Sequence, residues 1–398
     1  MAAGAPAADW SRSRSPAPRF RLYDRVELTA ITHEAALPRG LLASGTALNL
    51  YLRPLGLTRL ATDRAAIPLA GGPHGFARAE VIVRRPGRIV AAIAAVGEIR
   101  TWAAAEGAAI AERIESALAR LSRRRPAFAG LALDRPHLMG IVNVTPDSFS
   151  DGGRFLDPAR AIEHGKALAA AGADMLDVGG ESTRPGGLPV TIEAERERVV
   201  PVIAGLKDCG VPLSIDTRNS AVMEAALDAG ATIVNDVSAL THDPASVPLV
   251  VRRRAPVVLM HKRGEPATMQ QDPVYDCAPL DVYDYLEARL SAVGAAGMAP
   301  DNVVLDPGFG FGKTVTHNME IMARLSMFHG LGAPLLLGAS RKSTIAKLSR
   351  GESADQRLPG SLALGLVGLG QGVQLLRVHD VAETAQALAI WRAAEAWS

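Results

Sequence analysis

Two stretches of the sequence place many polar side chains directly after a short apolar run. The run at 138–142 is followed by a loop rich in Asn, Thr, Asp, Ser and Gly at 143–153. A second, mainly apolar run at 174–178 is followed by Gly-Gly-Glu-Ser-Thr-Arg-Pro-Gly at 179–186. A run of this kind is typical of a buried parallel strand. Because α/β folds place their chemistry beyond the carboxyl ends of such strands, both loops are predicted to belong to an active site.

Further polar residues follow the later apolar runs in the same manner. In chain order they are Asp216, Asn235, Asp236, Met260, His261, Lys262, Arg263, Asp306, Ser340, Arg341, Lys342, Ser343, Arg377 and His379. Strand alternation puts Arg377 and His379 on the same side of their strand.

One group of these residues suits an oxyanion. It combines the cations Arg184, Arg377 and His379 with the neutral oxygens of Asn143 and Thr183. Guanidinium groups bind phosphate oxygens in a bidentate fork, so phosphate or pyrophosphate is the expected ligand. Magnesium binds a few protein oxygens together with substrate phosphates, which makes Asn143 a candidate metal ligand.

A second group suits a flat, polar heterocycle. Its members are Asp216, Asn235, Asp306 and Lys342. Carboxylates can accept the paired N–H donors of an amino-pyrimidinone edge, and a lysine can serve a carbonyl or ring nitrogen. Each residue alone has a plainer interpretation, such as a helix cap or a solvated lysine. Their occurrence at consecutive strand ends favours a shared site.

The elements that must position these side chains form a regular repeat from residue 137 onward. Strands are predicted at 138–143, 174–178, 211–215, 232–235, 256–260, 302–305, 334–338 and 374–378. Helices are predicted at 158–172, 191–207, 219–229, 245–253, 279–296, 316–327, 357–371 and 380–396. This alternation predicts a (β/α)8 TIM barrel over 137–398, in which all strand-to-helix loops meet at one face. A doubly wound open sheet is the alternative, but its glycine-rich dinucleotide turn is missing after the first strand.

The glycine run at 308–312 does not form a phosphate-binding P-loop. That motif requires glycine five positions before the glycine of Gly-Lys-Thr, where this sequence has Pro307. We interpret the run as a loop that lets the backbone approach a ligand closely. The sequence also contains no Gly-x-Ser-x-Gly nucleophile motif.

The chain before residue 137 does not show the regular alternation of strands and helices. Strand-like runs occur at 26–31, 47–52, 81–83 and 89–94, and one helix is predicted at about 101–122. We expect residues 21–136 to form an α+β extension of unknown function, with a linker at about 123–136. The Ala-, Ser-, Pro- and Arg-rich residues 1–20 are predicted to form a disordered tail.

Composition excludes several classes of protein. Hydrophobic residues make up 48% and charged residues 21% of the chain, which is typical of a globular protein. No apolar run approaches the roughly 20 residues that span a membrane. A net charge of +2 and 4% aromatic residues argue against nucleic acid as the main partner. The two cysteines, Cys209 and Cys277, form no zinc pattern, and we expect them to be reduced in the cytoplasm.

Over roughly 137–398 the sequence resembles dihydropteroate synthase, the pterin-binding TIM-barrel family that sulfonamides inhibit. The matching stretches are 143–153, 177–186, 214–217, 234–236, 259–264, 306–313, 340–342 and 377–380. The resemblance implies condensation of 6-hydroxymethyl-7,8-dihydropterin diphosphate with 4-aminobenzoate to give 7,8-dihydropteroate and diphosphate in folate biosynthesis. It also implies a requirement for Mg²⁺ and a homodimer. Lys262 departs from the family pattern, which often has an uncharged residue there.

The resemblance further implies a role for individual residues. The pterin would contact Asp216, Asn235, Met260, Asp306, Phe311 and Lys342. The diphosphate would contact Asn143, Thr183, Arg184, Arg377 and His379, and Asn143 would bind the magnesium. The 4-aminobenzoate would contact Phe149, Pro185 and Ser343. Catalytic roles are expected for Asp147, Arg184, Asp216 and Lys342.

Two other functions are compatible with a pterin-binding barrel. A methyltetrahydrofolate-type methyltransferase would share the pterin residues but would not need Arg377, His379 and the loop at 145–151 for diphosphate. A non-catalytic pterin-binding protein should lack some of the diphosphate or magnesium residues. Release of diphosphate in the presence of 4-aminobenzoate discriminates among the three.

Overall fold

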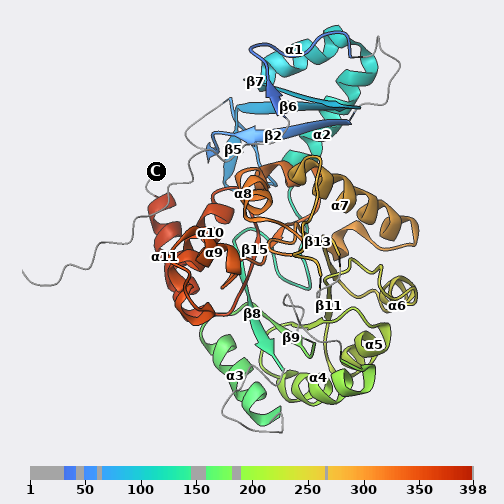
Figure 1. Cartoon of the computed structure of the whole chain (residues 1–398), viewed down its shortest axis with the longest axis vertical. Helices are drawn as coiled ribbons and strands as arrows, with labels where there is room; N and C mark the ends of the chain where they lie inside the picture. The colour runs from blue at the N-terminus through green and yellow to red at the C-terminus, as the bar shows by residue number, and fades with distance from the viewer. Residues whose placement is uncertain are drawn as a thin grey trace, which may run out of the picture.

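The computed structural model describes residues 31–41, 49–60, 65–144, 158–181, 190–264 and 268–396. Figure 1 shows a barrel with a smaller N-terminal extension on one side of it. The predicted tail at 1–20 and most of the strand-like run at 26–31 lie outside the described residues. None of the described helices is long and apolar enough to cross a membrane.

The barrel contains eight strands in sequential order. They are β8 (His137–Asn143), β9 (Met175–Gly179), β10 (Leu213–Asp216), β11 (Ile233–Asp236), β12 (Val257–Met260), β13 (Val303–Asp306), β14 (Leu336–Leu337) and β15 (Leu375–Val378). The sheet order is β13-β12-β11-β10-β9-β8-β15-β14, and all seven neighbouring pairs in it are parallel. A parallel bridge between Leu305 and Leu335 joins β13 to the start of β14 and closes the ring. The predicted (β/α)8 barrel is therefore confirmed.

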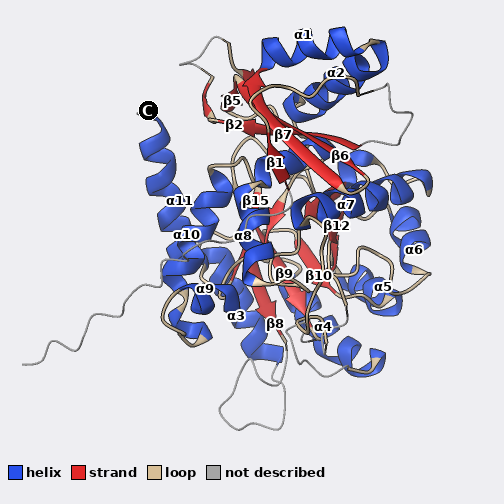
Figure 2. Ribbon diagram, turned by 45° about the horizontal axis from the view of Figure 1, so that its top comes forward, coloured by secondary structure: helices blue, strands red, loops and turns tan. Residues whose placement is uncertain are grey.

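Helices surround this ring, as Figure 2 shows. They are α3 (Pro158–Ala170), α4 (Ile192–Leu206), α5 (Ser220–Ala229), α6 (Ser246–Arg253), α7 (Ala278–Ala295), α8 (Val315–Ala323), α9 (Ser343–Leu348), α10 (Leu358–Leu369) and α11 (Val381–Ala396). The single helix predicted at 316–327 is wrong at its end, because α8 stops at Ala323 and the 3₁₀ helix η3 (Leu325–Leu331) follows. Helix α9 was not predicted, since six residues are too few to show a helical period.

Strand alternation explains how the barrel both fills its interior and carries a site. A buried cluster contains one apolar side chain from each of seven strands: Met139, Met175, Ile233, Val258, Val304, Leu336 and Leu375. The positions two residues later on five of these strands are Asp177, Asn235, Met260, Asp306 and Arg377. Side chains two residues apart lie on the same face of a strand, so these residues also point into the barrel, nearer its carboxyl end.

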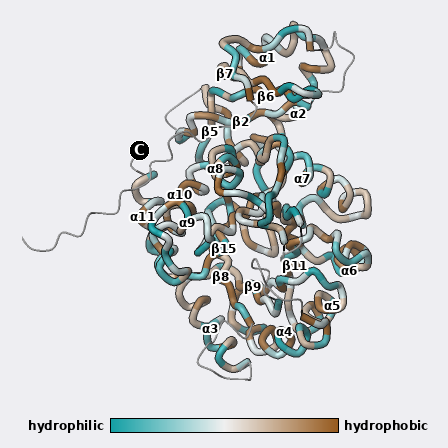
Figure 3. Tube along the Cα trace, viewed as in Figure 1, coloured by the Kyte–Doolittle hydropathy of each residue, from teal (hydrophilic) through white to brown (hydrophobic). Residues whose placement is uncertain are grey.

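The extension has its own sheet and core. Its main sheet has the order β1 (Ile31–His33), β7 (Arg88–Ala95), β6 (Arg78–Arg85), β2 (Asn49–Leu55), and a small second sheet contains β3 (Thr58–Arg59), β5 (His74–Phe76) and β4 (Ile67–Pro68). Along β6, Val81 and Val83 belong to the extension's core, whereas Ile82 joins the core cluster of the barrel. The sheet therefore packs on helices with one face and on the barrel with the other, and Figure 3 shows hydrophobic segments in both parts.

The prediction of one helix at about 101–122 is wrong. The structure has two helices there, α1 (Val96–Glu106) and α2 (Ala108–Ser122). They are separated by Gly107, whose φ of 114° is incompatible with an α-helix.

The residues between the extension and the barrel are well packed. Phe128 is fully buried and belongs to the same cluster as the lower interior residues of the barrel. Two backbone hydrogen bonds of 2.9 Å between Phe128 and Leu131 form a tight turn, and this turn carries the Phe128 ring. Arg125 is also buried and donates to the carbonyl of His329 at 2.9 Å. This connecting segment therefore closes the floor of the barrel.

Candidate active site

Arg377 lies at the centre of the polar cluster inside the barrel. Its Nε donates to Oδ2 of Asp177 at 2.6 Å, and one terminal nitrogen donates to Oδ2 of Asp216 at 2.7 Å. Asn235 donates from Nδ2 to the same Asp177 oxygen at 3.0 Å. Strand β15 is thereby linked to β9 and β10 across the barrel, so the expected oxyanion group and the expected heterocycle group meet in one cluster.

Two carboxylate oxygens of this cluster have no hydrogen-bond partner among the described residues. Oδ1 of Asp177 and Oδ1 of Asp216 are buried and accept no hydrogen bond from any described residue. Buried acceptors of this kind are rarely left without a partner in folded proteins, which indicates a ligand that supplies N–H or O–H donors.

Burial raises the pKa of Asp216 to about 7, and the neighbouring Asp177 acts in the same direction, while Arg377 opposes both. For Arg377, burial alone would lower the pKa, but Asp177 and Asp216 raise it above its ordinary value. A guanidinium between two carboxylates stays charged, so the cluster keeps a fixed cation beside a carboxyl that titrates near neutrality.

Asp306 lies at the end of β13, on the opposite side of the barrel from Asp177 on β9. Its Oδ1 accepts a hydrogen bond from the backbone N–H of Gly308 at 2.7 Å. Burial raises its pKa, although Gly308 and the nearby Lys342 and Lys313 oppose this shift. The predicted pterin residues Asp216, Asn235 and Asp306 thus all lie at buried carboxyl ends of strands.

Lys342 and Phe311 contact each other near the end of the barrel that carries Asp306. The ammonium nitrogen of Lys342 lies 3.8 Å from the centroid of the Phe311 ring, a cation–π contact between the residue preceding α9 and the glycine-rich loop. The Lys342 ammonium is also among the charges that lower the pKa of Asp306, so it lies on the same side of the barrel as that carboxyl.

The loop at 308–312 packs backbone against backbone on residues 261–263. A Cβ atom on Gly308 would lie 1.8 Å from the carbonyl oxygen of His261, and one on Gly312 would lie 2.1 Å from that of Arg263. No side chain fits at either position, so the glycines serve the packing of two loops. The prediction that this run lets the backbone approach a ligand closely stays a prediction, and the close approach that the described residues show is to another loop of the chain.

Lys313 is a functional candidate that the sequence did not reveal. It is only 2% exposed, and its Nζ contacts Nδ1 of His261 at 2.9 Å and the carbonyl oxygens of Gly308 and Phe311 at 2.8 and 3.1 Å. Burial lowers its pKa to about 7, assisted by Lys342 and opposed by Asp306. The lysine ties the glycine loop to the end of β12.

Asp177 was also missed as a site residue. It lies inside the mainly apolar run at 174–178, which the sequence predicts as a strand without giving Asp177 a role. The signal was its alternation with Met175, since both side chains must point into the barrel. By contrast, Asp236 accepts from the backbone N–H groups of Ser238 and Leu240 at 2.7 and 3.0 Å and so stabilises a turn.

The remaining predicted residues occupy the same end of the barrel where they are described. His379 contacts Oγ of Ser340 through Nδ1 at 3.1 Å, and Met260 is buried at the end of β12. Asn143 is half-buried at the end of β8, and Ser343 is exposed at the start of α9. Asp147, Phe149, Thr183, Arg184 and Pro185 lie outside the described residues, so their predicted roles stay predictions.

The magnesium that is expected at Asn143 stays a prediction. In the described part of the chain, no group of three or more His, Cys, Asp or Glu side chains could hold a metal. A magnesium ion here would therefore depend on few protein oxygens, such as that of Asn143, and on oxygens of a bound substrate. Magnesium commonly binds in this way when phosphates are present.

A family model described as pterin binding enzyme matches residues 139–379. Dihydropteroate synthase from Neisseria meningitidis serogroup B is 47% identical over 269 residues, which cover 66% of this chain and 94% of that protein. The Escherichia coli (strain K12) dihydropteroate synthase is 43% identical over 261 residues, covering 65% and 92%.

Solved structures agree with these sequence relatives. The Xanthomonas albilineans dihydropteroate synthase with 4-aminobenzoic acid superposes with a TM-score of 0.64 and 47% identity, covering 67% of this chain and 97% of that chain. The same enzyme in complex with 7,8-dihydropteroate gives a TM-score of 0.61 and 45% identity, with coverage of 67% and 96%. The match to the family model spans most of the barrel and includes its polar cluster, and the chain belongs to the dihydropteroate synthase family of pterin-binding enzymes.

Proposed function

We propose that this chain condenses 6-hydroxymethyl-7,8-dihydropterin diphosphate with 4-aminobenzoate, releasing diphosphate and forming 7,8-dihydropteroate. The observation that carries the proposal is the ion-paired cluster of Arg377, Asp177 and Asp216 inside a barrel of this family. It combines a cation for a leaving diphosphate with buried carboxylates that still lack hydrogen-bond donors.

The reaction replaces one bond at the pterin methylene carbon. The carbon–oxygen bond to diphosphate breaks, the carbon–nitrogen bond to the aromatic amine forms, and the amine loses a proton. An aromatic amine is mostly neutral near pH 7, so departure of diphosphate is the demanding part. Cations beside the leaving group and an anion beside the developing positive charge on the methylene and ring lower that barrier.

Individual residues can be given parts in this reaction. Asp216, Asn235 and Asp306 bind the amino-pyrimidinone edge and hold the ring in place, and Lys342 donates to one of its acceptors. Arg377 and His379 bind the diphosphate, and ionised Asp216 stabilises positive charge on the ring. Arg184, Asp147 and Thr183 would complete the diphosphate side, and Phe149, Pro185 and Ser343 the 4-aminobenzoate side.

Bound magnesium would neutralise charge on the diphosphate and make it a better leaving group. Asn143 is the residue of this chain that we propose as its ligand. Asn143 is half-buried at the end of β8, and oxygens of the substrate and of water would supply the other ligands of the ion.

The two alternative functions are less well supported. A methyltransferase of the methyltetrahydrofolate type has no use for an arginine and a histidine beside the pterin acids, yet Arg377 and His379 both lie at the end of β15. A non-catalytic pterin-binding protein would not need to retain them either. The two sequence relatives described above, which this chain covers to 94% and 92% of their length, are dihydropteroate synthases.

We also propose a homodimer in the cytoplasm. Helix α10 contains no charged residue, yet Val367 on it is 50% exposed and Ile390 on α11 is 69% exposed. A second copy of the chain would remove these side chains from water.

Both cysteines of the chain are free, which accords with the reducing compartment of the proposed cytoplasmic location.

The proposed reaction is tested by incubating the full chain with the pterin diphosphate, Mg²⁺ and 4-aminobenzoate, and measuring diphosphate and dihydropteroate together. Equal amounts of both products, formed only when 4-aminobenzoate is present, would support the proposal. Diphosphate release that ignores 4-aminobenzoate, or no release, would refute it.

A further inference from the structure

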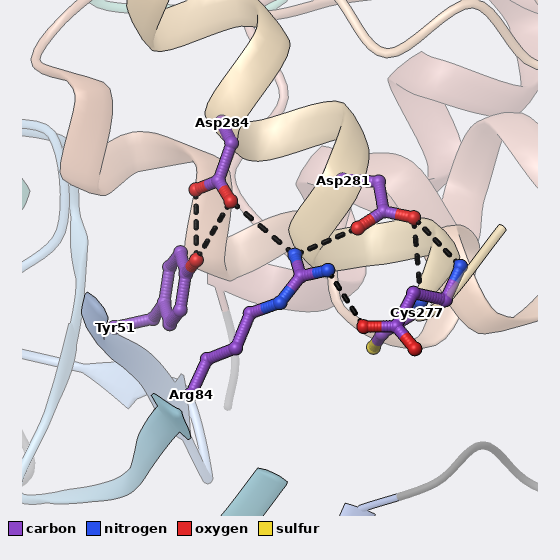
Figure 4. Close-up of polar contacts among 6 residues, drawn as sticks. Tyr51, Arg84, Cys277, Asp281 and Asp284 are labelled. Atoms are coloured by element: carbon purple, nitrogen blue, oxygen red, sulfur yellow. Dashed lines mark hydrogen bonds and ion pairs between the residues drawn. The ribbon is translucent and has the colours of Figure 1, made fainter. Parts of the chain in front are cut away.

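One arginine of the extension forms ion pairs with carboxylates at the start of helix α7. Arg84, near the end of β6, lies 2.8 Å from Oδ2 of Asp276, 2.7 Å from Oδ1 of Asp281 and 3.3 Å from Oδ2 of Asp284 (Figure 4). Burial alone would lower the pKa of Arg84, but its bonds to Asp281 and Asp276 raise the pKa above the ordinary value. The guanidinium is therefore a permanent cation that joins carboxylates of the barrel to the extension's sheet.

A second residue of the extension also contacts the start of α7. The buried Tyr51 on β2 donates its hydroxyl to Asp284, with distances of 2.7 and 3.0 Å to the two carboxylate oxygens. Its ring packs edge-on against Tyr283, with centroids 5.2 Å apart. The first turns of α7 are thus fixed by polar and aromatic contacts from outside the barrel.

The carboxylates that Arg84 contacts also shape the loop before α7. Oδ2 of Asp281 accepts from the backbone N–H groups of Asp276 and Cys277 at 2.9 and 3.3 Å, which joins the two residues before α7 to its first turns. Arg84 therefore contacts both Asp281 and Asp276, the residue directly after Tyr275. Any shift of this junction would move the end of the loop that connects β12 to α7.

That loop supports the glycine-rich loop of the active site. Tyr275 donates its hydroxyl to the carbonyl oxygen of Gly312 at 2.8 Å, and Gln270 donates to that of Gly310 at 2.6 Å. Between these two glycines lies Phe311, whose ring holds the ammonium of Lys342. A continuous set of contacts thus leads from the extension to the wall of the proposed pterin site.

We propose that Arg84 and Tyr51 are positioning residues for the reaction: the extension holds residues 268–277 and, through Tyr275 and Gly312, sets the position of Phe311 and Lys342. The inference rests on the proposed function, because it assumes that Lys342 binds the pterin. It gives the extension a defined part in substrate binding while placing none of its residues in contact with substrate.

The inference predicts a selective effect on one substrate. Replacing Arg84 by alanine in the full chain should weaken binding of the pterin diphosphate about fivefold to tenfold, within the range observed when residues remote from a ligand alter its affinity. The dissociation constant is measured by calorimetry. The KM for 4-aminobenzoate should change less than about twofold, because the contacts that carry the inference end at the side chain of Lys342, which is assigned to the pterin.

A matched control separates positioning from general destabilisation. Arg100 and Glu115 form an ion pair on α1 and α2, with side chains 47% and 54% exposed. Arg100→Ala removes an arginine of the same extension and should leave pterin affinity unchanged. Tyr51→Phe keeps the packed ring and removes only the bond to Asp284, so it should fold even if Arg84→Ala does not, and should weaken pterin binding in the same direction.

A double-mutant cycle tests the route. Tyr275→Phe removes the hydrogen bond to Gly312 and should weaken pterin binding by itself. If Arg84 acts through Tyr275, the double variant should be little worse than Tyr275→Phe alone. Independent, multiplying effects would overturn the route, and wild-type pterin affinity in both Arg84→Ala and Tyr51→Phe would overturn the inference. Failure of the wild-type chain to release diphosphate with 4-aminobenzoate would instead refute the proposed function.

Discussion

Arg377 and Asp216 are ion-paired across the barrel, with 2.7 Å between a guanidinium nitrogen and Oδ2 of the carboxylate. They come from β15 and β10, which are separated in the sheet by β8 and β9. The cation assigned to the diphosphate therefore also neutralises the acid assigned to the pterin. Binding of one part of the substrate should consequently affect the electrostatics experienced by the other.

The first prediction concerns this shared cation. Arg377→Met should lower the free energy of unfolding by about 3–5 kcal/mol, because it leaves Asp177 and Asp216 as buried carboxylates without their partner. Urea denaturation at pH 8 measures the loss. Arg252→Met is the control, since the pair of Arg252 with Glu224 has side chains 61% and 50% exposed and should contribute less than about 1 kcal/mol. Equal stability losses in the two variants would show that the central ion pair is dispensable for folding.

The second prediction uses the buried lysine. Since burial lowers the pKa of Lys313 to about 7, the folded protein binds fewer protons than the unfolded chain between about pH 7 and pH 10. Stability must then rise with pH across this window, by up to about 1.4 kcal/mol per pH unit from this residue. Urea denaturation at several pH values should show that slope reduced in Lys313→Met but not in Lys166→Met, whose lysine is exposed. An identical slope in both variants would mean that Lys313 titrates normally.

The third prediction concerns the floor of the barrel. Phe128 is fully buried among residues from seven strands, so Phe128→Ala should cost about 3–5 kcal/mol of stability through lost burial and the cavity that remains. Ile93→Ala changes a side chain that is 46% exposed and should cost much less. Denaturant titrations of both variants decide the matter, and a cost below about 1 kcal/mol for Phe128→Ala would contradict the described packing.

The fourth prediction concerns magnesium. Chelation with EDTA should abolish turnover and leave the thermal midpoint almost unchanged, because the described barrel is held by apolar packing and internal ion pairs. Turnover should return when Mg²⁺ is added back. A thermal midpoint that collapses in EDTA would indicate a structural metal and would remove the proposed role of Asn143.

Local sequence patterns were sufficient to predict the barrel and many of its polar residues. The apolar runs of β8 to β15 and the helical periods between them are short-range signals, and the polar residues at their ends, such as Asp216, Asn235 and Asp306, follow from the repeat itself. The break at Gly107 was missed because one glycine does not interrupt the apolar period around it.

Long-range contacts were beyond the reach of these patterns. The pairing of Arg377 with Asp177 depends on barrel closure, which brings together side chains that are 200 residues apart. The contacts of Arg84 with the start of α7 depend on how the extension docks, and nothing in the spacing of either segment specifies that. Phe128 resembles any apolar residue of a connecting segment until the open floor of the barrel is known.

The most direct test of the proposed chemistry is a single-turnover measurement on Asp216→Asn at pH 8, where the wild-type carboxyl, with its pKa of about 7, is ionised. The substitution keeps the shape and most hydrogen bonding but removes the negative charge beside the pterin, while Arg377 keeps its bond to Asp177. Only interactions stronger in the transition state raise the chemical rate. The account predicts a rate about 10²- to 10³-fold lower, the scale of losing one preorganised electrostatic group, and pterin affinity only about tenfold weaker. A near wild-type rate, or a loss confined to binding, would contradict the role of Asp216 in stabilising the developing charge.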